Sequence, residues 1–153
     1  MRPFLMIAVL LGSFAVAFAN DAVTGCVVKV LPFLVDTNGC IARSPSLFDR
    51  DAYQAYLRQH TNEISAIRFD VLWKASNAKA AKLKLRAELR GIGERGLPTQ
   101  TVLETEVTPG FFRSWTSLPL GGDDLKNFGS LIAWRVTLRD GDRLLGEQKS
   151  FLW

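Results

Sequence analysis

The sequence is poor in the side chains that most enzymes use for catalysis. Its 153 residues include one histidine, His60, and two cysteines, and no serine lies in a nucleophile motif. A lone histidine without metal-ligand or nucleophile partners leaves little for acid-base, nucleophilic or metal chemistry. The string G-x-G-x-x-G at residues 91–96 lacks the strand-to-helix context of a dinucleotide site. We therefore expect no catalytic residue, no metal and no cofactor.

Long apolar runs are absent after the start of the chain. Residues 1–19 begin with the basic Arg2, continue through an apolar stretch and end with Ala17 and Ala19 in an A-x-A pattern, which is typical of a cleaved secretory signal peptide. The stretch is shorter than the ~20 consecutive apolar residues that a spanning helix needs. We therefore expect an exported protein, periplasmic or extracellular, with no membrane span in the mature chain.

No excess of one charge is concentrated anywhere. The chain has 19 Lys and Arg against 15 Asp and Glu, a net charge of +4, and the two signs are interleaved along it. Such spacing is typical of an ordinary solvated surface, so no nucleic-acid partner is expected. The 48% hydrophobic content is enough for a single core.

Cysteine is scarce, but export changes what the two cysteines can do. Cys26 and Cys40 enclose 13 residues, and an oxidising compartment favours a disulfide between them. The sequence leaves both a bridge and two separate thiols open.

The clearest structural signal is a β-hairpin in residues 131–153. Alternate residues of its first strand are apolar, which is the period of a half-buried strand: Ile132, Trp134, Val136 and Leu138. A turn at residues 140–142 contains Asp-Gly. A three-residue turn would place Leu138 opposite Leu144 and Arg135 opposite Glu147.

Similar patterns predict further strands and one helix. Strands are expected at residues 26–35, 64–74, 82–90, 101–107 and 111–118, with 64–74 and 82–90 as antiparallel neighbours. A capping box at residues 46–49 predicts a helix over 49–60. Its apolar stripe should lie against a sheet: Tyr53, Tyr56, Leu57 and His60.

These elements predict an all-β fold. About seven strands, one inserted helix and no β-α-β rhythm favour an antiparallel two-sheet sandwich over residues 20–153. The final hairpin, WRVTLRDGDRLL, and Trp73 on an early core strand resemble the immunoglobulin-like or fibronectin type III-like sandwiches. The resemblance concerns architecture and implies no particular activity.

The leading functional hypothesis is an exported, non-enzymatic binding module for a protein or polysaccharide partner. The large aromatic and arginine side chains that usually anchor an interface point to Phe111, Arg113 and Trp115, unless these aromatics belong to the core. Leu131, Phe151 and Trp153 fall opposite Trp134, so the helix either covers them or leaves an exposed aromatic patch.

Two alternatives remain open from the sequence. One is a hydrolase with a pair of carboxylates, drawn from Asp36, Asp49 or Asp51 with Glu104 or Glu106. The other is an exported inhibitor or assembly factor, which differs from the leading hypothesis only in its partner.

Overall fold

The computed structural model describes residues 22–78 and 82–153. The predicted signal peptide, residues 1–19, lies outside the described residues, as does part of the connection that follows Asn77. The elements are, in chain order, β1 (Thr24–Asp36), α1 (Leu47–Gln59), the 3-10 turn η1 (Thr61–Glu63), β2 (Ile64–Ser76), β3 (Leu83–Ile92), β4 (Pro98–Val107), β5 (Ser114–Gly121), α2 (Gly122–Phe128), β6 (Ser130–Asp140) and β7 (Arg143–Lys149).

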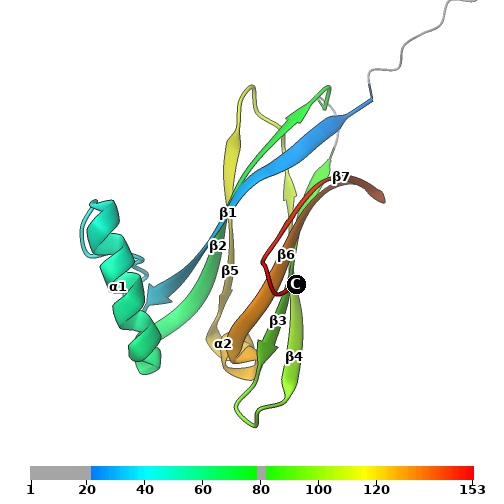
Figure 1. Cartoon of the computed structure of the whole chain (residues 1–153). Coiled ribbons are helices and arrows are strands. Elements are labelled where there is room, and N and C mark those ends of the chain that lie inside the picture. Colours follow the sequence, from blue (N-terminus) through cyan, green and yellow to red (C-terminus); the bar gives the residue numbers. More distant parts are fainter. Residues whose placement is uncertain (1–21, 79–81) are drawn as a thin grey trace, which may run out of the picture.

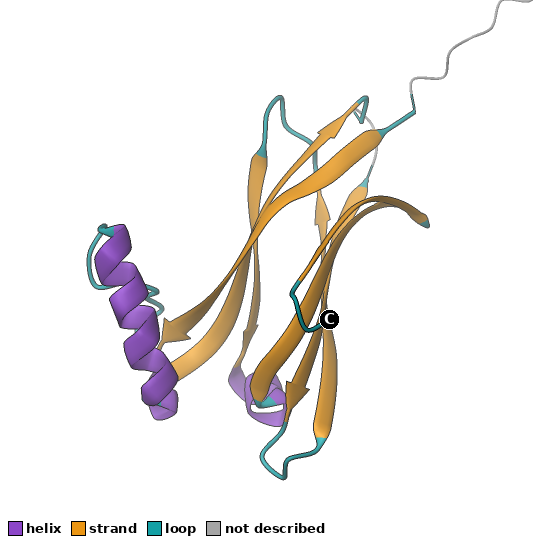
Figure 2. Ribbon diagram, viewed as in Figure 1, coloured by secondary structure: helices purple, strands orange, loops and turns teal. Residues whose placement is uncertain are grey.

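The strands form two antiparallel sheets (Figures 1 and 2). One sheet has the order β1-β2-β5, and the other has the order β4-β3-β6-β7. The predicted all-β sandwich of about seven strands with an inserted helix is therefore confirmed.

The core lies between the two sheets and comes from the inward positions of the alternating strands. Trp73 and Phe69 on β2 are fully buried, and Trp73 donates a 2.9 Å hydrogen bond from Nε1 to Thr116 Oγ1 on β5. From the opposite sheet, β3 and β6 contribute fully buried aliphatic side chains: Leu83, Leu85, Ala87, Leu89, Val136 and Leu138.

The predicted pairing of strands 64–74 and 82–90 is wrong. These segments became β2 and β3, which are central strands of different sheets. Each bonds to two other neighbours, β2 to β1 and β5, and β3 to β4 and β6. The alternation of apolar residues correctly identified which face of each strand is buried. Two strands with one buried face each can lie side by side in one sheet or face each other from opposing sheets, and the alternation is the same in both cases.

The register predicted for the final hairpin is also wrong. Asp140 pairs with Arg143, so the turn has two residues instead of three, and a register shift after Leu138 places that residue opposite Gly146 instead of Leu144. Glu147 consequently faces Thr137. Arg135 still approaches Glu147 diagonally, with Nη1 and Oε2 4.0 Å apart.

The two sheets come into close contact along a seam between the first half of β1 and β7. A Cβ at Gly146 would lie 2.6 Å from Cys26 Cα, so the main chains meet where only glycine fits. Farther along the seam, Gln148 Nε2 donates a 3.0 Å hydrogen bond to the carbonyl oxygen of Val28. This seam joins the two sheets along one edge of the sandwich.

The second half of β1 leads away from the seam to α1, which lies beside the sandwich (Figure 1). Ser46 caps the helix as predicted, with its Oγ accepting a 3.4 Å hydrogen bond from Asp49 N. The predicted stripe is partly confirmed, because Tyr53 and Leu57 are buried against the end of β1 while Tyr56 and His60 are half-buried.

The disulfide that the sequence left open is not formed. Cys26 and Cys40 are both free thiols, because β1 runs between them as a continuous strand from Thr24 to Asp36. At about 3.3 Å per residue, the strand separates the two positions by far more than the roughly 7 Å between Cα atoms that a disulfide can span.

Candidate binding surfaces

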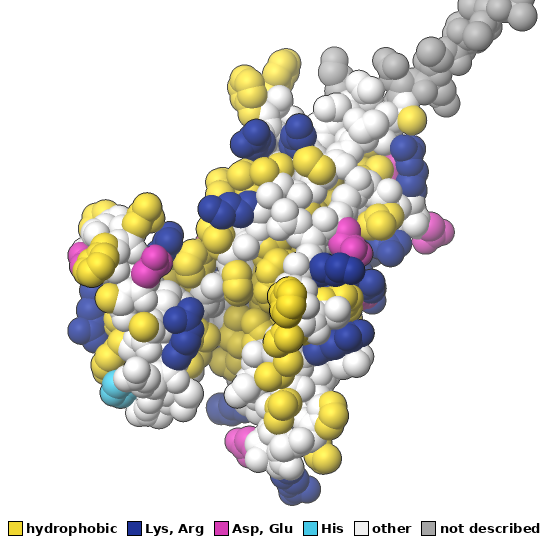
Figure 3. Space-filling model, viewed as in Figure 1, with side chains coloured by type: hydrophobic (Ala, Val, Ile, Leu, Met, Phe, Trp, Pro, Cys, Tyr) yellow, Lys and Arg dark blue, Asp and Glu magenta, His cyan; other side chains and the backbone are white. Residues whose placement is uncertain are grey.

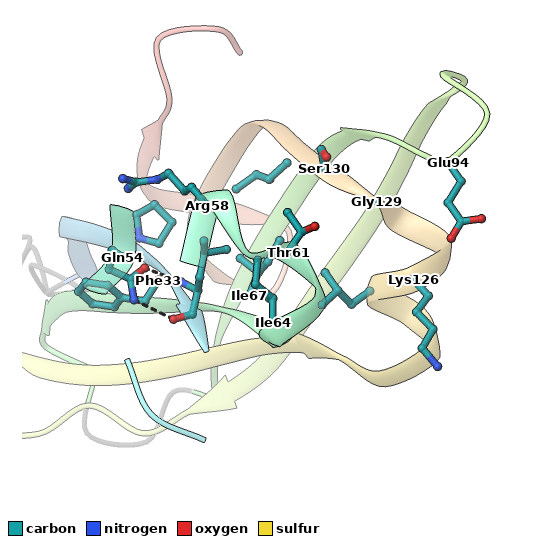
Figure 4. Close-up of a pocket in the computed structure, with 14 residues that line it drawn as sticks. Phe33, Gln54, Arg58, Thr61, Ile64, Ile67, Glu94, Lys126, Gly129 and Ser130 are labelled. Atoms are coloured by element: carbon teal, nitrogen blue, oxygen red, sulfur yellow. Dashed lines mark hydrogen bonds between the residues drawn. The ribbon is translucent and has the colours of Figure 1, made fainter. Parts of the chain in front are cut away.

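A cleft of about 620 Å³ lies between α1 and the open end of the sandwich (Figure 4). Its apolar lining comes from β1, β2, α2 and β6: Pro32, Phe33, Leu34, Ile64, Ile67, Leu125 and Leu131. Figure 3 shows the same region as a hollow of hydrophobic side chains between the helix and the neighbouring sheet. Leu34, Leu125 and Leu131 are only partly buried, so the cleft presents apolar surface to solvent.

Gln54 determines where the wall of this cleft stands. Its side-chain amide accepts a hydrogen bond from Leu34 N and donates to Leu34 O, each at 2.8 Å, and it also donates to Ile41 O at 2.9 Å. The amide thus occupies the place that a neighbouring strand would take beside β1 (Figure 4). Pro32 has no N–H to offer at this edge. The second half of β1 is therefore closed to pairing with another strand.

The opposite wall differs, because β6 is longer than β7. Pairing with β7 begins at Arg135, and Ser150 adds one backbone hydrogen bond to Trp134 O at 2.9 Å. The first residues of β6, 130–133, pair with β3 on one side only. This open edge of β6 borders the cleft, into which Ser130 and Leu131 face.

Three charged side chains stand at the rim of the cleft. Arg58 projects from α1, Lys126 from α2 and Glu94 from the loop between β3 and β4 (Figure 4). Within the described parts of the chain, no acidic side chain forms an ion pair with Arg58, whereas Lys126 pairs with Asp123 at 3.2 Å. The α1 side of the cleft is therefore positively charged.

Asp36 and Tyr53 fix α1 to the end of β1. Tyr53 Oη donates a 2.6 Å hydrogen bond to Asp36 Oδ2, and the backbone N–H groups of Asn38 and Cys40 donate to Asp36 Oδ1 at 2.8 Å. The bond from Tyr53, with those from the backbone, lowers the pKa of Asp36 below 3.8. The same bond raises the pKa of Tyr53. Arg43 lies over the Tyr53 ring, 4.7 Å from its centroid.

The residues that the sequence suggested as interface anchors lie at the opposite end of the molecule. Phe111 and Arg113 are in the loop before β5, and Trp115 is on that strand. Phe111 is 98% exposed and Trp115 is 55% exposed, so neither is part of the core. Phe112 belongs to the same surface, being 85% exposed. The predicted strand at 111–118 starts later, at Ser114.

The charged outer face of β3 is internally neutralised. Glu88 accepts hydrogen bonds from Arg135 and from Arg86, which also donates to Glu104 Oε1 at 2.6 Å. Burial raises the pKa of Glu88, but these arginines outweigh it and the net shift is downward. Arg86 and Lys84 lower the pKa of Glu104. Lys84, Arg86 and Arg135 are thus engaged with acids of the same face.

The C-terminal residues end on this charged face without being covered by α1. The Trp153 ring lies under two guanidinium groups, with Arg90 Cζ 4.0 Å and Arg135 Cζ 4.9 Å from its centroid. Phe151 is fully exposed. The helix therefore covers neither residue. Of the three residues predicted to lie opposite Trp134, only Leu131 lines the cleft.

The acids proposed for a hydrolase are divided between separate elements. Asp36 ends β1, Asp49 and Asp51 lie on α1, and Glu104 and Glu106 lie on β4 in the other sheet. Among residues 22–78 and 82–153, no three His, Cys, Asp or Glu side chains are grouped so as to hold a metal ion. The same residues include no helix that is long and apolar enough to cross a membrane.

The fold defines the class of this protein as a two-sheet antiparallel sandwich with a cleft beside its inserted helix. Comparison with protein-family models, with curated proteins and with solved structures gives no match. Sequence reasoning missed the cleft and Gln54, since a polar residue within a helix gives no sign that it pairs with a strand edge. Leu131, which did not fit one core, was the available signal for the cleft.

Proposed function

We propose that this protein is an exported, non-enzymatic binding module that takes an extended segment of a partner polypeptide into the cleft beside α1. The segment adds as a strand to the open edge of β6. Its alternate side chains enter the apolar cleft, and an acidic group near one end meets Arg58. The observation on which this rests is the mismatch in length between β6 and β7.

Strand addition follows from the chemistry of an unpaired edge. A strand with a free edge presents N–H and C=O groups that can bond to another chain. Proteins normally blunt such edges, and here β1 is blunted by Gln54 and Pro32. The edge at residues 130–133 has no comparable cover in the described chain. The edge of β1 is protected from pairing while the neighbouring edge of β6 is left open, and this contrast favours a binding role for the edge of β6.

The lining of the cleft favours a polypeptide over a polysaccharide. Main-chain hydrogen bonds give affinity in strand addition, and pockets for alternate side chains give specificity. Seven apolar side chains line the cleft, whereas a sugar needs many polar partners for its hydroxyl groups. Arg58 adds a charge-assisted contact for a carboxylate.

We also propose that the architecture is immunoglobulin-like. The order β4-β3-β6-β7 corresponds to a GFC sheet with an added strand beside C, and β1-β2-β5 corresponds to strands A, B and E. In this assignment β7 is strand G, which is short here. A short last strand accounts for the open edge of its neighbour.

The carboxylate hydrolase is less well supported. A general acid needs a raised pKa near the working pH, but the pKa values of Asp36 and Glu104 are lowered by their hydrogen-bond partners. The inhibitor or assembly factor remains compatible with the proposal, because both act by holding another polypeptide.

The test is selection from a phage-displayed library of random linear peptides against the immobilised chain from residue 20 onward. We expect enrichment of peptides with alternating apolar residues and an acidic residue. Enriched peptides should lose binding to Leu131→Lys, which places a charge in the cleft, and to Arg58→Glu. They should protect the amides of residues 130–132 from hydrogen exchange.

Two matched variants serve as controls. Val102→Lys places the same charge on exposed apolar surface of β4, and Arg143→Glu reverses an exposed cation at the β6-β7 turn. Both should bind the enriched peptides normally. The proposal fails if no peptide is enriched, or if the enriched peptides bind Leu131→Lys as well as Val102→Lys.

A further inference from the structure

A second surface lies at the end of the sandwich away from the cleft, where the loop of residues 108–113 joins β4 to β5. The loop projects at the end of the molecule (Figure 1). Phe111 and Phe112 at its tip are 98% and 85% exposed, and their ring centroids are 6.3 Å apart. Two adjacent phenylalanines held in water are unfavourable for an isolated protein, because each exposes apolar area that burial would remove.

Cations lie directly behind the two rings. Phe111, Phe112, Lys74 and Arg113 line one shallow hollow, together with the small residues Ala75 and Ser76. Figure 3 shows this layering as hydrophobic side chains at the extreme end with Lys and Arg side chains behind them. Ion pairs among the described residues involve other cations, not Lys74 or Arg113.

The segments that meet at this tip contain no acidic residue. Residues 71–78, 82–87 and 107–122 lack both Asp and Glu, and the first and last of these segments adjoin because Trp73 pairs with Ser114. The nearest acids are Glu106, which directly precedes the second segment on β4, and Asp140 and Asp142 in the turn between β6 and β7, where Arg139 and Arg143 balance their charge. The tip itself therefore has a net positive charge.

We propose that this loop docks the protein on an anionic lipid bilayer, with Phe111 and Phe112 inserted into the interface and Lys74 and Arg113 against lipid phosphates. A folded protein partner would need a pocket shaped for two projecting rings, whereas the bilayer interface admits them without one. The cations stand where phosphates would lie once the rings are inserted, and an anionic surface attracts them. The proposal does not depend on the peptide cleft.

Vesicle flotation of the chain from residue 20 onward tests this docking. Phosphatidylcholine vesicles with and without phosphatidylglycerol are the probes. We expect flotation with the anionic vesicles only, weakened by added salt. Phe111→Ser with Phe112→Ser should weaken the partition by about tenfold or more for each ring, and Lys74→Glu with Arg113→Glu by about fivefold or more for each cation.

Phe151→Ser and Arg95→Glu are the matched controls. Phe151 is as exposed as Phe111 but lies away from the tip, and Arg95 is an exposed cation of the loop between β3 and β4, at the opposite end of the strands. Both variants should float like the parent chain. All substituted side chains are exposed, so unchanged urea unfolding will show that the tip variants are folded. The proposal is overturned by equal flotation with neutral vesicles, by no flotation at all, or by a tip double variant that floats like Phe151→Ser.

Discussion

Replacing Gln54 by alanine should destabilise the protein strongly, although the residue is polar and lies on a helix beside the sandwich. The change removes three hydrogen bonds, two to Leu34 and one to Ile41, from a side chain that is 5% exposed. At about 1 kcal/mol each, these bonds correspond to about 3 kcal/mol of unfolding free energy. That is a large part of the roughly 5–15 kcal/mol that stabilises a typical domain.

Urea unfolding followed by circular dichroism measures this effect. The midpoint should fall while the slope with denaturant stays constant, because the surface exposed on unfolding is almost the same. Gln59→Ala is the matched control, since it makes the same substitution on the same helix at an exposed position. Its effect should be a few tenths of a kcal/mol, because Gln and Ala differ little in helix propensity.

Hydrogen exchange adds a local measurement. The amide of Leu34 is protected in the native protein by Gln54 Oε1 and should exchange much faster in Gln54→Ala than in Gln59→Ala. Equal unfolding free energies for the two variants, within about 0.5 kcal/mol, would refute the reasoning that the amide of Gln54 substitutes for a strand.

Two further predictions concern pH and the C-terminus. The pKa of Asp36 is lowered chiefly by the hydrogen bond from Tyr53. The contribution of this carboxylate to stability is therefore complete above its ordinary pKa of 3.8 and is lost as pH falls through the lower folded-state value. Tyr53→Phe should reduce this acid-induced fall in Tm, and parallel curves of Tm against pH for the two proteins would contradict the prediction. Trp153→Ala should lower the free energy of unfolding by about 1–2 kcal/mol, because it removes two cation-π contacts. Phe151→Ala, at a fully exposed site, should leave urea unfolding unchanged. Equal losses of unfolding free energy for the two variants would show that the stacking contributes nothing.

The burial pattern of this fold could be predicted from the sequence because period-two alternation is a local property. The inward faces of β2 and β3 followed from alternate apolar residues, with Val71, Trp73 and Leu85 among them. Strand neighbours could not be predicted in the same way. Both β2 and β3 are central, so an apolar face alone does not say whether the next strand lies beside it or opposite it.

Register failed for a different reason. The shift near Ile132 adds one residue to β6, and the shift after Leu138 adds one residue, Leu145, to β7. One extra residue reverses the faces that follow. Ile132, predicted to point into the core, is 45% exposed, while its neighbour Ala133 is buried. Such bulges leave no mark in an alternating sequence.

The candidate surfaces depended on features that are not local. Phe111 and Arg113 were identified from residue type alone, and a strand or a loop would have fitted the same sequence. The cleft arises because β7 leaves the first residues of β6 unpaired and because α1 is attached to the edge of β1 through Gln54. Neither the relative lengths of paired strands nor the direction of a helix after its strand is encoded in hydrophobic periodicity.

The close contact between Gly146 and Cys26 holds the two sheets at a fixed distance along one line. Two main chains in direct contact have no flexible side chain between them, so atomic radii alone determine how closely the sheets approach along this line. Leu34 and Leu131 lie farther along, on β1 and β6, where the two strands form opposite walls of the cleft. A methyl group at position 146 would push the two sheets apart at this contact, and its effect on the width of the cleft would grow with distance from the contact.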